Sequence, residues 1–272
     1  MKIAAIQMVS GLSCSANLKA AEELIYQSAQ QGAELVVLPE YFCILGARDT
    51  DKLEVKEEFG SGPIQEMLSR NALRHKIWIV GGTLPLEVQS ESNKAYNASL
   101  VFDPQGNCVA QYKKIHLFKF KNLQEQYDES KTLVAGDSPV VFDVLSKDGN
   151  TWRIGLSICY DLRFPELYRA LSDKGADLIL APSAFTYTTG AAHWEVLLRA
   201  RAIENQVWML AAAQGGVHEN LRRTWGQSMI VNPWGKVICQ LESGEGCLVQ
   251  DINKSEMLSV RVDLPALEHR RL

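Results

Sequence analysis

The sequence predicts an α/β protein made of two mixed sheets, each covered by helices, that pack face to face. Three observations support this prediction. Short apolar strands alternate with segments of helical periodicity, the strand segments are almost continuously apolar, and the second half of the chain repeats the plan of the first. Continuous apolar runs are typical of strands buried on both faces, so each sheet needs a cover on either side.

The first half reads as alternating strands and helices. Gly32 is suited to end the first helix, and Gly106 supplies the tight backbone of the DPQGN turn. The expected elements are a strand over KIAAIQM (2–8), a helix over 15–31, a strand over ELVVLPE (34–40), a helix over 63–75, a strand over IWIVGG (77–82) and a hairpin over 95–113.

The second half repeats four of these segments in the same order. The alternative interpretation is that all α/β chains look alike at this level. The matched pairs are KIAAIQM with WRIGLSIC (152–159), GAELVVLPE (32–40) with GADLILAPS (175–183), IWIVGGT (77–83) with VWMLAAA (207–213), and VFDPQGNCVAQ (101–111) with VNPWGKVICQ (231–240).

The repeat predicts where chemistry can gather. Cys159 takes the position of Met8, and Glu40 takes the position of Ser183. Both positions lie at the carboxyl ends of their strands, where open α/β sheets place ligand sites. One crevice is therefore expected to receive residues from both halves.

Composition excludes several functions. The net charge of −4 and a pI near 5.8 give no basic footprint for nucleic acid. No apolar run approaches the roughly 20 residues that span a bilayer, and MKIAAIQMVSG does not resemble a signal peptide. We therefore expect a soluble, cytoplasmic protein. The six cysteines show no CxxC and no regular spacing, so neither a zinc site nor a disulfide framework is predicted.

Two charged residues are candidates for catalysis. Glu40 follows an apolar strand directly, where a carboxylate is costly to bury unless it is paired or functional, and it is either a general base or a capping or salt-bridged residue. Adjacent residues of an extended segment point to opposite faces, so Lys114 in QYKKIHLF can turn inward and stabilise an oxyanion. The alternative is a solvated basic pair. His116 is expected to be structural.

Cys159 ends the apolar run RIGLSI, and a helix is expected to open near Pro165. A thiol at such a junction faces backbone N–H groups and a helix dipole, which lower its pKa and make it a nucleophile. The arrangement is similar to the strand-turn-helix elbow of serine hydrolases, without its GxSxG sequence. An inert buried cysteine is the alternative.

These segments resemble the three signature blocks of the nitrilase, or carbon–nitrogen hydrolase, superfamily. The blocks are LPE with Glu40, YKKIHLF with Lys114 and ICYDLRFPEL with Cys159, in the family order. The resemblance extends over nearly the whole chain, which implies one carbon–nitrogen hydrolase domain over residues 1–272 and a four-layer α-β-β-α sandwich. Further matching segments are PSAF…TTGAAHWEVLLRARAIENQ (182–206), WGQSMIVNPWG (225–235) and LPALEHRR (264–271).

The resemblance implies a role for each of five residues. Cys159 would attack an amide carbonyl, Glu40 would take the thiol proton and later activate water, and Lys114 with the backbone N–H of Tyr160 would bind the oxyanion. Glu129, in DESKTLVAGD, matches the family's second glutamate, although a surface acid is the alternative. No metal or organic cofactor is required. A homodimer or larger homo-oligomer is implied as well.

Within the family the chain looks most like the Nit-type amidases. One group of these acts on deaminated glutathione, which we favour, and another comprises omega-amidases acting on α-ketoglutaramate and α-ketosuccinamate. Arg163 could bind a substrate carboxylate or instead pair with Asp161 or Glu166. Phe185 and Thr189 could form the pocket wall, with a core role as the alternative for Phe185.

Two other functions remain as alternatives. A catalytically silent carboxylate-binding or scaffold protein would not need Glu40, Lys114 and Cys159 together. A papain-like thiol protease would carry its cysteine in a Gly/Ser-rich block near the start of the mature chain, unlike ICYDLRF.

Overall fold

The computed structural model describes residues 1–123 and 126–271. Two larger sheets and two small hairpins carry the strands. The helices of the described chain are α1 (Cys14–Gln30), α2 (Pro63–His75), α3 (Pro165–Asp173), α4 (Tyr187–Asn205) and α5 (Lys254–Asp263), with 3-10 turns η1 (Asp51–Leu53), η2 (Glu129–Lys131) and η3 (Cys159–Arg163).

The first sheet has the order β18-β1-β2-β3-β5-β4, and β6 and β9 also pair with β5. Strands β1, β2 and β3 run parallel, whereas β18 joins β1 and β5 joins β3 antiparallel. Its strands are β1 (Lys2–Gln7), β2 (Leu35–Val37), β3 (Trp78–Val80), β4 (Leu84–Glu87), β5 (Ala95–Phe102), β6 (Cys108–Lys113), β9 (Leu133–Val134) and β18 (Gly246–Asp251).

The second sheet has the order β10-β11-β12-β13-β16-β17, with β11, β12 and β13 parallel. Its strands are β10 (Val141–Leu145), β11 (Thr151–Leu156), β12 (Leu178–Leu180), β13 (Trp208–Ala211), β16 (Met229–Val231) and β17 (Val237–Gln240). The two hairpins are β7 (Lys119–Lys121) with β8 (Gln126–Asp128), and β14 (Gly215–Val217) with β15 (Arg223–Trp225).

The strand register follows the internal repeat residue by residue. Ile3 pairs with Leu35, and Leu35 pairs with Trp78 in the first sheet. In the second sheet Ile154 pairs with Leu178, and Leu178 pairs with Trp208. These residues are the ones that the sequence alignment of the two halves matches, so the predicted repeat is confirmed in strand order and in register.

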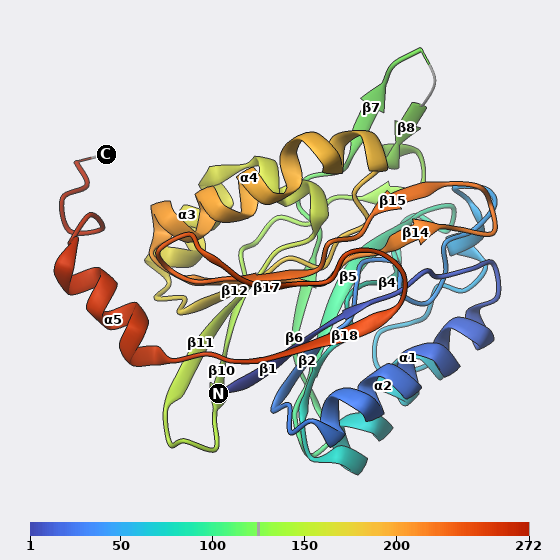
Figure 1. Cartoon of the computed structure of the whole chain (residues 1–272). Helices are drawn as coiled ribbons and strands as arrows, with labels where there is room; N and C mark the ends of the chain where they lie inside the picture. Colours follow the sequence, from blue (N-terminus) through green and yellow to red (C-terminus); the bar gives the residue numbers. More distant parts are fainter. Residues whose placement is uncertain (124–125, 272) are drawn as a thin grey trace.

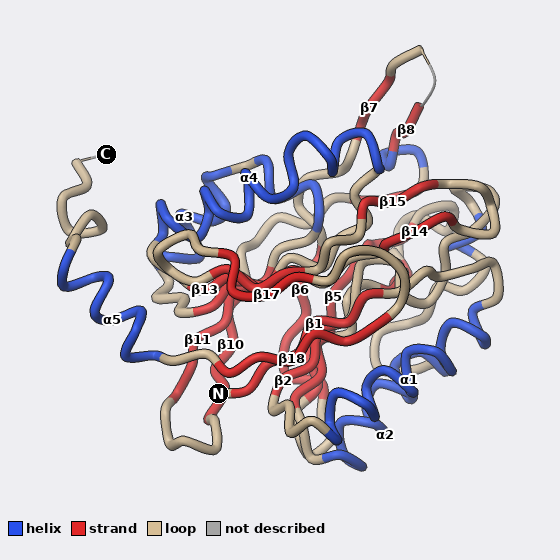
Figure 2. Tube along the Cα trace, in the orientation of Figure 1, coloured by secondary structure: helices blue, strands red, loops and turns tan. Residues whose placement is uncertain are grey.

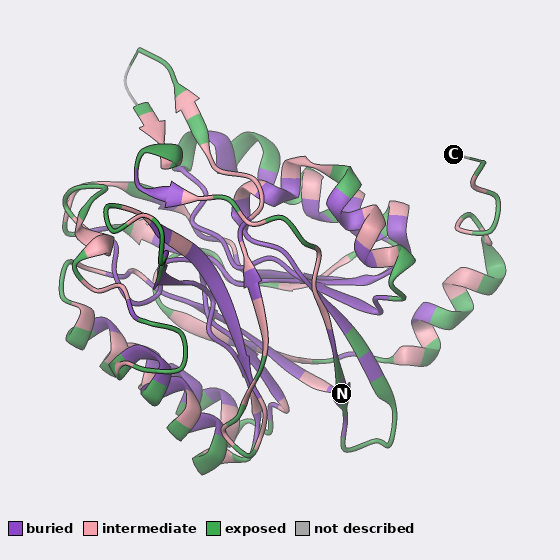
Figure 3. Cartoon of the chain, turned by 180° about the vertical axis from the view of Figure 1, so that it is seen from behind, coloured by how far each residue is buried: buried purple, intermediate pink, exposed green. Residues whose placement is uncertain are grey.

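The layers form an α-β-β-α sandwich (Figure 1). One face of the first sheet packs on α1 and α2, and its other face joins a core shared with the second sheet. Leu167 of α3 and Trp194 of α4 belong to the same cluster as the strands of the second sheet, so α3 and α4 cover that sheet. Figure 2 shows the strands enclosed between helices, and Figure 3 shows that the central strands are buried.

The first-half helices end close to their predicted bounds. Ser13 caps α1 by accepting from the N–H of Ala16, and Gly32 follows it with φ +85°. The left-handed conformation that Gly32 needs is one that glycine adopts without strain. Helix α2 begins with Pro63 as its first residue and spans the predicted 63–75. Of the described helices, none is long and apolar enough to cross a membrane.

Candidate active site

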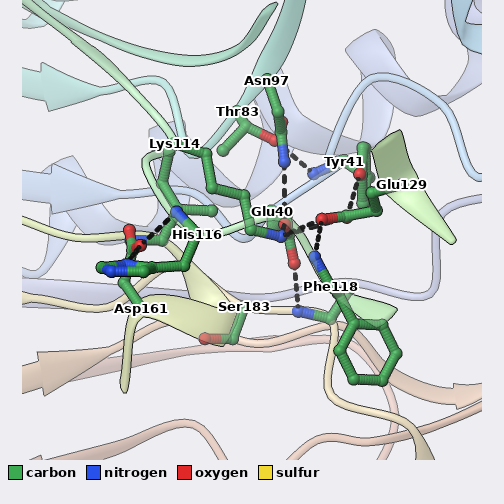
Figure 4. Close-up of polar contacts among 12 residues, drawn as sticks. Glu40, Tyr41, Thr83, Asn97, Lys114, His116, Phe118, Glu129, Asp161 and Ser183 are labelled. Carbon is green, nitrogen blue, oxygen red and sulfur yellow. Dashed lines mark hydrogen bonds and ion pairs between the residues drawn. The ribbon is translucent and has the colours of Figure 1, made fainter. Parts of the chain in front are cut away.

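Glu40 lies just beyond β2, and its carboxylate is held by both halves of the chain (Figure 4). Oε1 accepts hydrogen bonds from Asn97 Nδ2 and Lys114 Nζ, each at 2.8 Å. Oε2 accepts the backbone N–H of Ala184 at 2.9 Å. The side chain is 1% exposed. Burial without partners would be costly, so these three donors allow the carboxylate to stay charged in the interior.

Lys114 follows β6 and turns inward, as the alternation of the two lysines predicts. Its Nζ lies 2.8 Å from Glu40 Oε1 and 2.8 Å from Glu129 Oε2, and it is fully buried. Burial alone would lower the pKa of Lys114, but Glu129 and Glu40 raise it well above its usual value. Lys113 instead lies over the ring of Tyr96, with Nζ 3.9 Å from the ring centroid. The solvated-pair alternative therefore does not hold for Lys114.

Glu129 is a mostly buried acid, with 13% of its side chain exposed, and is engaged inside the site. Besides Lys114, it accepts the Tyr41 hydroxyl at 2.7 Å and the backbone N–H of Phe118 at 2.7 Å. Burial opposes its ionised form, yet Lys114 and these hydrogen bonds hold the pKa of Glu129 below its usual value. The network thus places one ammonium group between two carboxylates (Figure 4).

Cys159 stands at a strand-to-helix junction. Strand β11 ends at Leu156, η3 begins at Cys159, and α3 follows from Pro165. The backbone N–H of Cys159 bonds to the Pro182 carbonyl at 3.0 Å, and its φ is +47°. A non-glycine residue in this conformation costs about 1–3 kcal/mol, and such strain gathers at functional sites. The predicted similarity to a nucleophile elbow extends to this backbone geometry.

The expected lowering of the thiol pKa is wrong. Burial raises the pKa of Cys159 well above its usual value, and the negative charge of Glu40 and a hydrogen bond to it add to the rise, against an opposing effect of Lys114. The reason is that the thiol is buried and lies beside the Glu40 carboxylate, and both disfavour the thiolate. In this structure the thiol is protonated beside a carboxylate that can accept its proton.

Asp161 organises the backbone after the nucleophile. It accepts the N–H of Ile158 at 2.9 Å, the Tyr112 hydroxyl at 2.7 Å and the N–H of His116 at 3.0 Å. His116 also places Nδ1 2.7 Å from Asp161 and stacks on Phe164, with ring centroids 3.7 Å apart. The structural role predicted for His116 is therefore confirmed.

Tyr160 is the second residue of η3, so its backbone N–H has no partner within that turn. This N–H directly follows the nucleophile. A donor in this position is available to an oxyanion formed at the thiol.

A small cavity lies beside the thiol. The structure brings the predicted residues Arg163, Phe185 and Thr189 together there with Cys159. Its complete lining is Phe118, Cys159, Tyr160, Arg163, Ala184, Phe185, Thr186 and Thr189.

Arg163 keeps its guanidinium available in this cavity. It lies 3.2 Å from His193 Nδ1 and 5.4 Å from the centroid of the Phe185 ring. The alternative of an ion pair with Asp161 or Glu166 is wrong, because Arg163 forms no ion pair with either acid in the described part of the chain and the Asp161 oxygens are taken by the donors described above. Phe185 lies at the cavity wall and also packs on Trp194, with ring centroids 5.0 Å apart.

Thr189 is partly engaged within its own helix. Its Oγ1 lies 2.9 Å from that of Thr186, whose side chain caps α4 by accepting the N–H of Thr189. Only one of these two hydroxyls donates to the other, so the second hydroxyl can donate its proton to a ligand in the cavity.

Sequence reasoning missed four participants: Tyr41, Asn97, Phe118 and Asp161. Tyr41 and Asp161 lie next to predicted catalytic residues in LPEYF and ICYD, so proximity was a usable signal. Phe118 ends the YKKIHLF block that contains Lys114, but its contribution is a backbone N–H, which its residue type does not reveal. Asn97 is far from the predicted catalytic residues in sequence and carried no such signal. Over residues 1–123 and 126–271, no group of three or more His, Cys, Asp or Glu residues could hold a metal ion.

The fold and this Glu–Lys–Cys arrangement agree with a family assignment. The family described as carbon–nitrogen hydrolase matches residues 2–262. The chain belongs to this family of hydrolases.

Two relatives cover nearly all of the chain. The deaminated glutathione amidase of Synechocystis sp. (strain PCC 6803 / GT-S) is 44% identical over 270 residues, covering 98% of this chain and 97% of the relative. The omega-amidase NIT2 of Xenopus tropicalis is 37% identical over 271 residues, covering 99% and 95%.

Solved structures agree with the fold. Saccharomyces cerevisiae Nit3, a member of branch 10 of the nitrilase superfamily, superposes with a TM-score of 0.88 at 30% identity, covering all of this chain and 97% of Nit3. A mutant amidase from Nesterenkonia sp. AN1, in which acrylamide has added to the active-site cysteine, has a TM-score of 0.77 at 25% identity, covering 98% of this chain and 99% of the amidase.

Proposed function

We propose that this chain is an amidase that hydrolyses a small carboxylate-bearing amide, with deaminated glutathione as the preferred substrate. The observation that carries the proposal is the meeting of Cys159, Glu40 and Lys114 in one buried cluster beside a cavity lined by Arg163. The 44% identical relative named for this activity supports the choice of substrate.

In the proposed first step, Glu40 accepts the Cys159 proton as the sulfur attacks the amide carbonyl. Deprotonation coupled to attack is needed because the resting thiol has a raised pKa. Lys114 and the N–H of Tyr160 stabilise the oxyanion. Glu40 then gives the proton to the departing amine, which leaves a thioester on Cys159.

In the second step, Glu40 takes a proton from a water molecule that attacks the thioester. The collapse of the tetrahedral intermediate releases the acid and returns the proton to the sulfur. Glu129 keeps the Lys114 ammonium in place throughout, because it holds Nζ at 2.8 and 3.0 Å. It also balances the buried positive charge while Glu40 is protonated.

Arg163 is proposed to hold the carboxylate of the acyl part of the substrate, with Phe185 as the wall and Thr189 as a polar contact. Guanidinium groups bind carboxylates through two parallel hydrogen bonds. The absence of an acidic partner for Arg163 within the described chain leaves that geometry available.

An omega-amidase is the second candidate, favoured by the 37% identity to omega-amidase NIT2. Parallel turnover assays on deaminated glutathione, α-ketoglutaramate and simple aliphatic amides distinguish the two. We expect the highest kcat/KM on deaminated glutathione. A higher value on α-ketoglutaramate would favour the omega-amidase, and no turnover of any amide would favour a silent carboxylate-binding or scaffold protein.

We also propose that the chain is a single domain that works in the cytoplasm as a homodimer or larger homo-oligomer. All six cysteines are free, which suits a reducing compartment. Light scattering coupled to size exclusion would test the assembly, and a monomer would contradict it.

A further inference from the structure

A second cavity lies next to the thiol cavity, and Phe118 lines both. Its lining includes the side chains of Tyr41 and Glu129, which belong to the catalytic cluster, and two cations, Lys52 and Arg222. The catalytic cluster therefore borders two spaces, one with Arg163 and one with these two cations.

Lys52 is a partly buried cation without a hydrogen-bonding partner among the described residues. It lies in η1, with Nζ 5.1 Å from the centroid of the Tyr41 ring. In the part of the chain that the structure describes, its ammonium group makes no hydrogen bond or ion pair. Burial lowers its pKa, although Glu129 and Asp49 act in the opposite direction. A partly desolvated ammonium with three unused donors is well suited to bind an anion.

Arg222 faces the same cavity from the loop before β15. Its guanidinium lies over the Tyr127 ring, 4.9 Å from the centroid. Its positive charge contributes to the lowered pKa of Lys52, so the two cations repel each other across the cavity.

The acids around this cavity are largely committed elsewhere. Glu129 is bound by Lys114, Tyr41 and Phe118, and Asp128 pairs with Lys119 at 3.3 Å. Asp49 also lines the cavity but is exposed to solvent. Lys52 and Arg222 thus share the cavity with two acids that are engaged by other groups and one acid that is exposed.

We propose that Lys52 and Arg222 form a second carboxylate subsite, which selects amides carrying a carboxylate on each side of the scissile bond. This inference rests on the proposed function, in which Arg163 holds the first carboxylate. A substrate whose leaving group is a carboxylate-bearing amine can occupy both subsites. An ω-amide that releases ammonia can occupy only one.

The test compares Lys52→Met and Arg222→Met with Lys131→Met, which alters an exposed lysine close to Glu129 in sequence. The substrates are deaminated glutathione, the same compound with its glycine carboxylate converted to an amide, and α-ketoglutaramate. We expect Lys52→Met and Arg222→Met each to raise KM for deaminated glutathione about 10- to 100-fold, the loss typical of a charged hydrogen bond. KM for the other two substrates and all constants of Lys131→Met should stay near wild type.

Equal losses on all three substrates, or no loss on deaminated glutathione, would overturn the subsite. Binding of intact deaminated glutathione to Cys159→Ala, with and without Lys52→Met, separates this inference from the catalytic proposal. If wild type turns over none of the amides, the proposed function fails. The binding comparison then still decides the subsite, with a 10-fold or greater weakening supporting it and unchanged affinity overturning it.

Discussion

The Glu40 carboxylate accepts the backbone N–H of Ala184 at 2.9 Å, which joins the two halves one residue away from matching positions of the repeat. Glu40 follows the strand of the first half, and Ala184 follows Ser183, the residue that the repeat aligns with Glu40. The second half also supplies Cys159. The base and the nucleophile therefore come from opposite halves and are held together by the sandwich itself.

Replacing Glu40 with Gln is expected to lower the pKa of Cys159 and to abolish turnover at the same time. The charge of Glu40 and its hydrogen bond raise the thiol pKa, while Lys114 lowers it. Glu40→Gln should therefore react faster with iodoacetamide at neutral pH. Its kcat should fall by about 10²- to 10⁴-fold, since the general base is lost.

Asp161→Asn serves as the control for Glu40→Gln, because it alters a carboxylate that supports the same loop without contacting Glu40. It should not speed alkylation. Slower or unchanged alkylation of Glu40→Gln would contradict the assignment of Glu40 as the group that holds the thiol proton.

Replacing Glu129 with Gln should reduce kcat. It should also make the free energy of unfolding less dependent on pH below about pH 4.5. The folded pKa of Glu129 lies below its ordinary value of 4.5. Its contribution to the free energy of unfolding is therefore fully present above about pH 4.5 and is lost as the pH falls through the folded pKa. Urea unfolding between pH 7 and about pH 3 would measure this. An unchanged pH slope in Glu129→Gln would show that the carboxyl does not contribute.

Replacing Gly82 with Ala should disturb Glu40 through the backbone. Gly82 has φ +43°, and a Cβ there would overlap the carbonyl oxygens of Leu38 and Pro39. We expect a loss of about 1–3 kcal/mol in the free energy of unfolding beyond the backbone penalty, together with reduced kcat. Gly60→Ala is the matched control, because its φ is +88° and nothing lies within 4 Å of the added atom. Equal losses in both variants would exclude the clash.

Replacing Arg163 with Leu should weaken catalysis on acidic amides more than on neutral ones. Losing a guanidinium–carboxylate contact typically costs about 1.5–3 kcal/mol, or 10- to 150-fold in kcat/KM. Arg74→Leu, on the exposed surface of α2, should leave both classes unchanged. An equal loss on aliphatic and carboxylate-bearing amides would eliminate Arg163 as a carboxylate anchor.

The architecture could be predicted because the repeated segments of the sequence are the buried strands of the two sheets. Apolar runs around Ile3, Leu35, Ile154 and Leu178 carry both the pattern and the register. The small hairpins of β7 with β8 and β14 with β15 were not predicted, since segments such as KFK and GGV are short and lack an apolar alternation.

The chemistry of the site could be predicted only in part. Glu40, Lys114 and Cys159 each lie in a short sequence block, LPE, YKKIHLF and ICYDLRFPEL, that identifies them as candidate catalytic residues. The thiol pKa depends instead on burial and on a carboxylate from the other half of the chain. The Lys52 and Arg222 pair depends on two segments that meet only in the folded protein. Both the thiol pKa and the cation pair result from tertiary packing, which a local sequence pattern does not reveal.

Turnover by Cys159→Ala decides whether Cys159 is the nucleophile. The variant should fold with an unchanged unfolding midpoint, because the substitution removes one sulfur at a cavity edge. Its release of amine or ammonia from deaminated glutathione and α-ketoglutaramate should fall at least about 10⁴-fold, as for other enzymes deprived of their nucleophile. Turnover near the wild-type rate on either amide would contradict the assignment of Cys159 as the nucleophile.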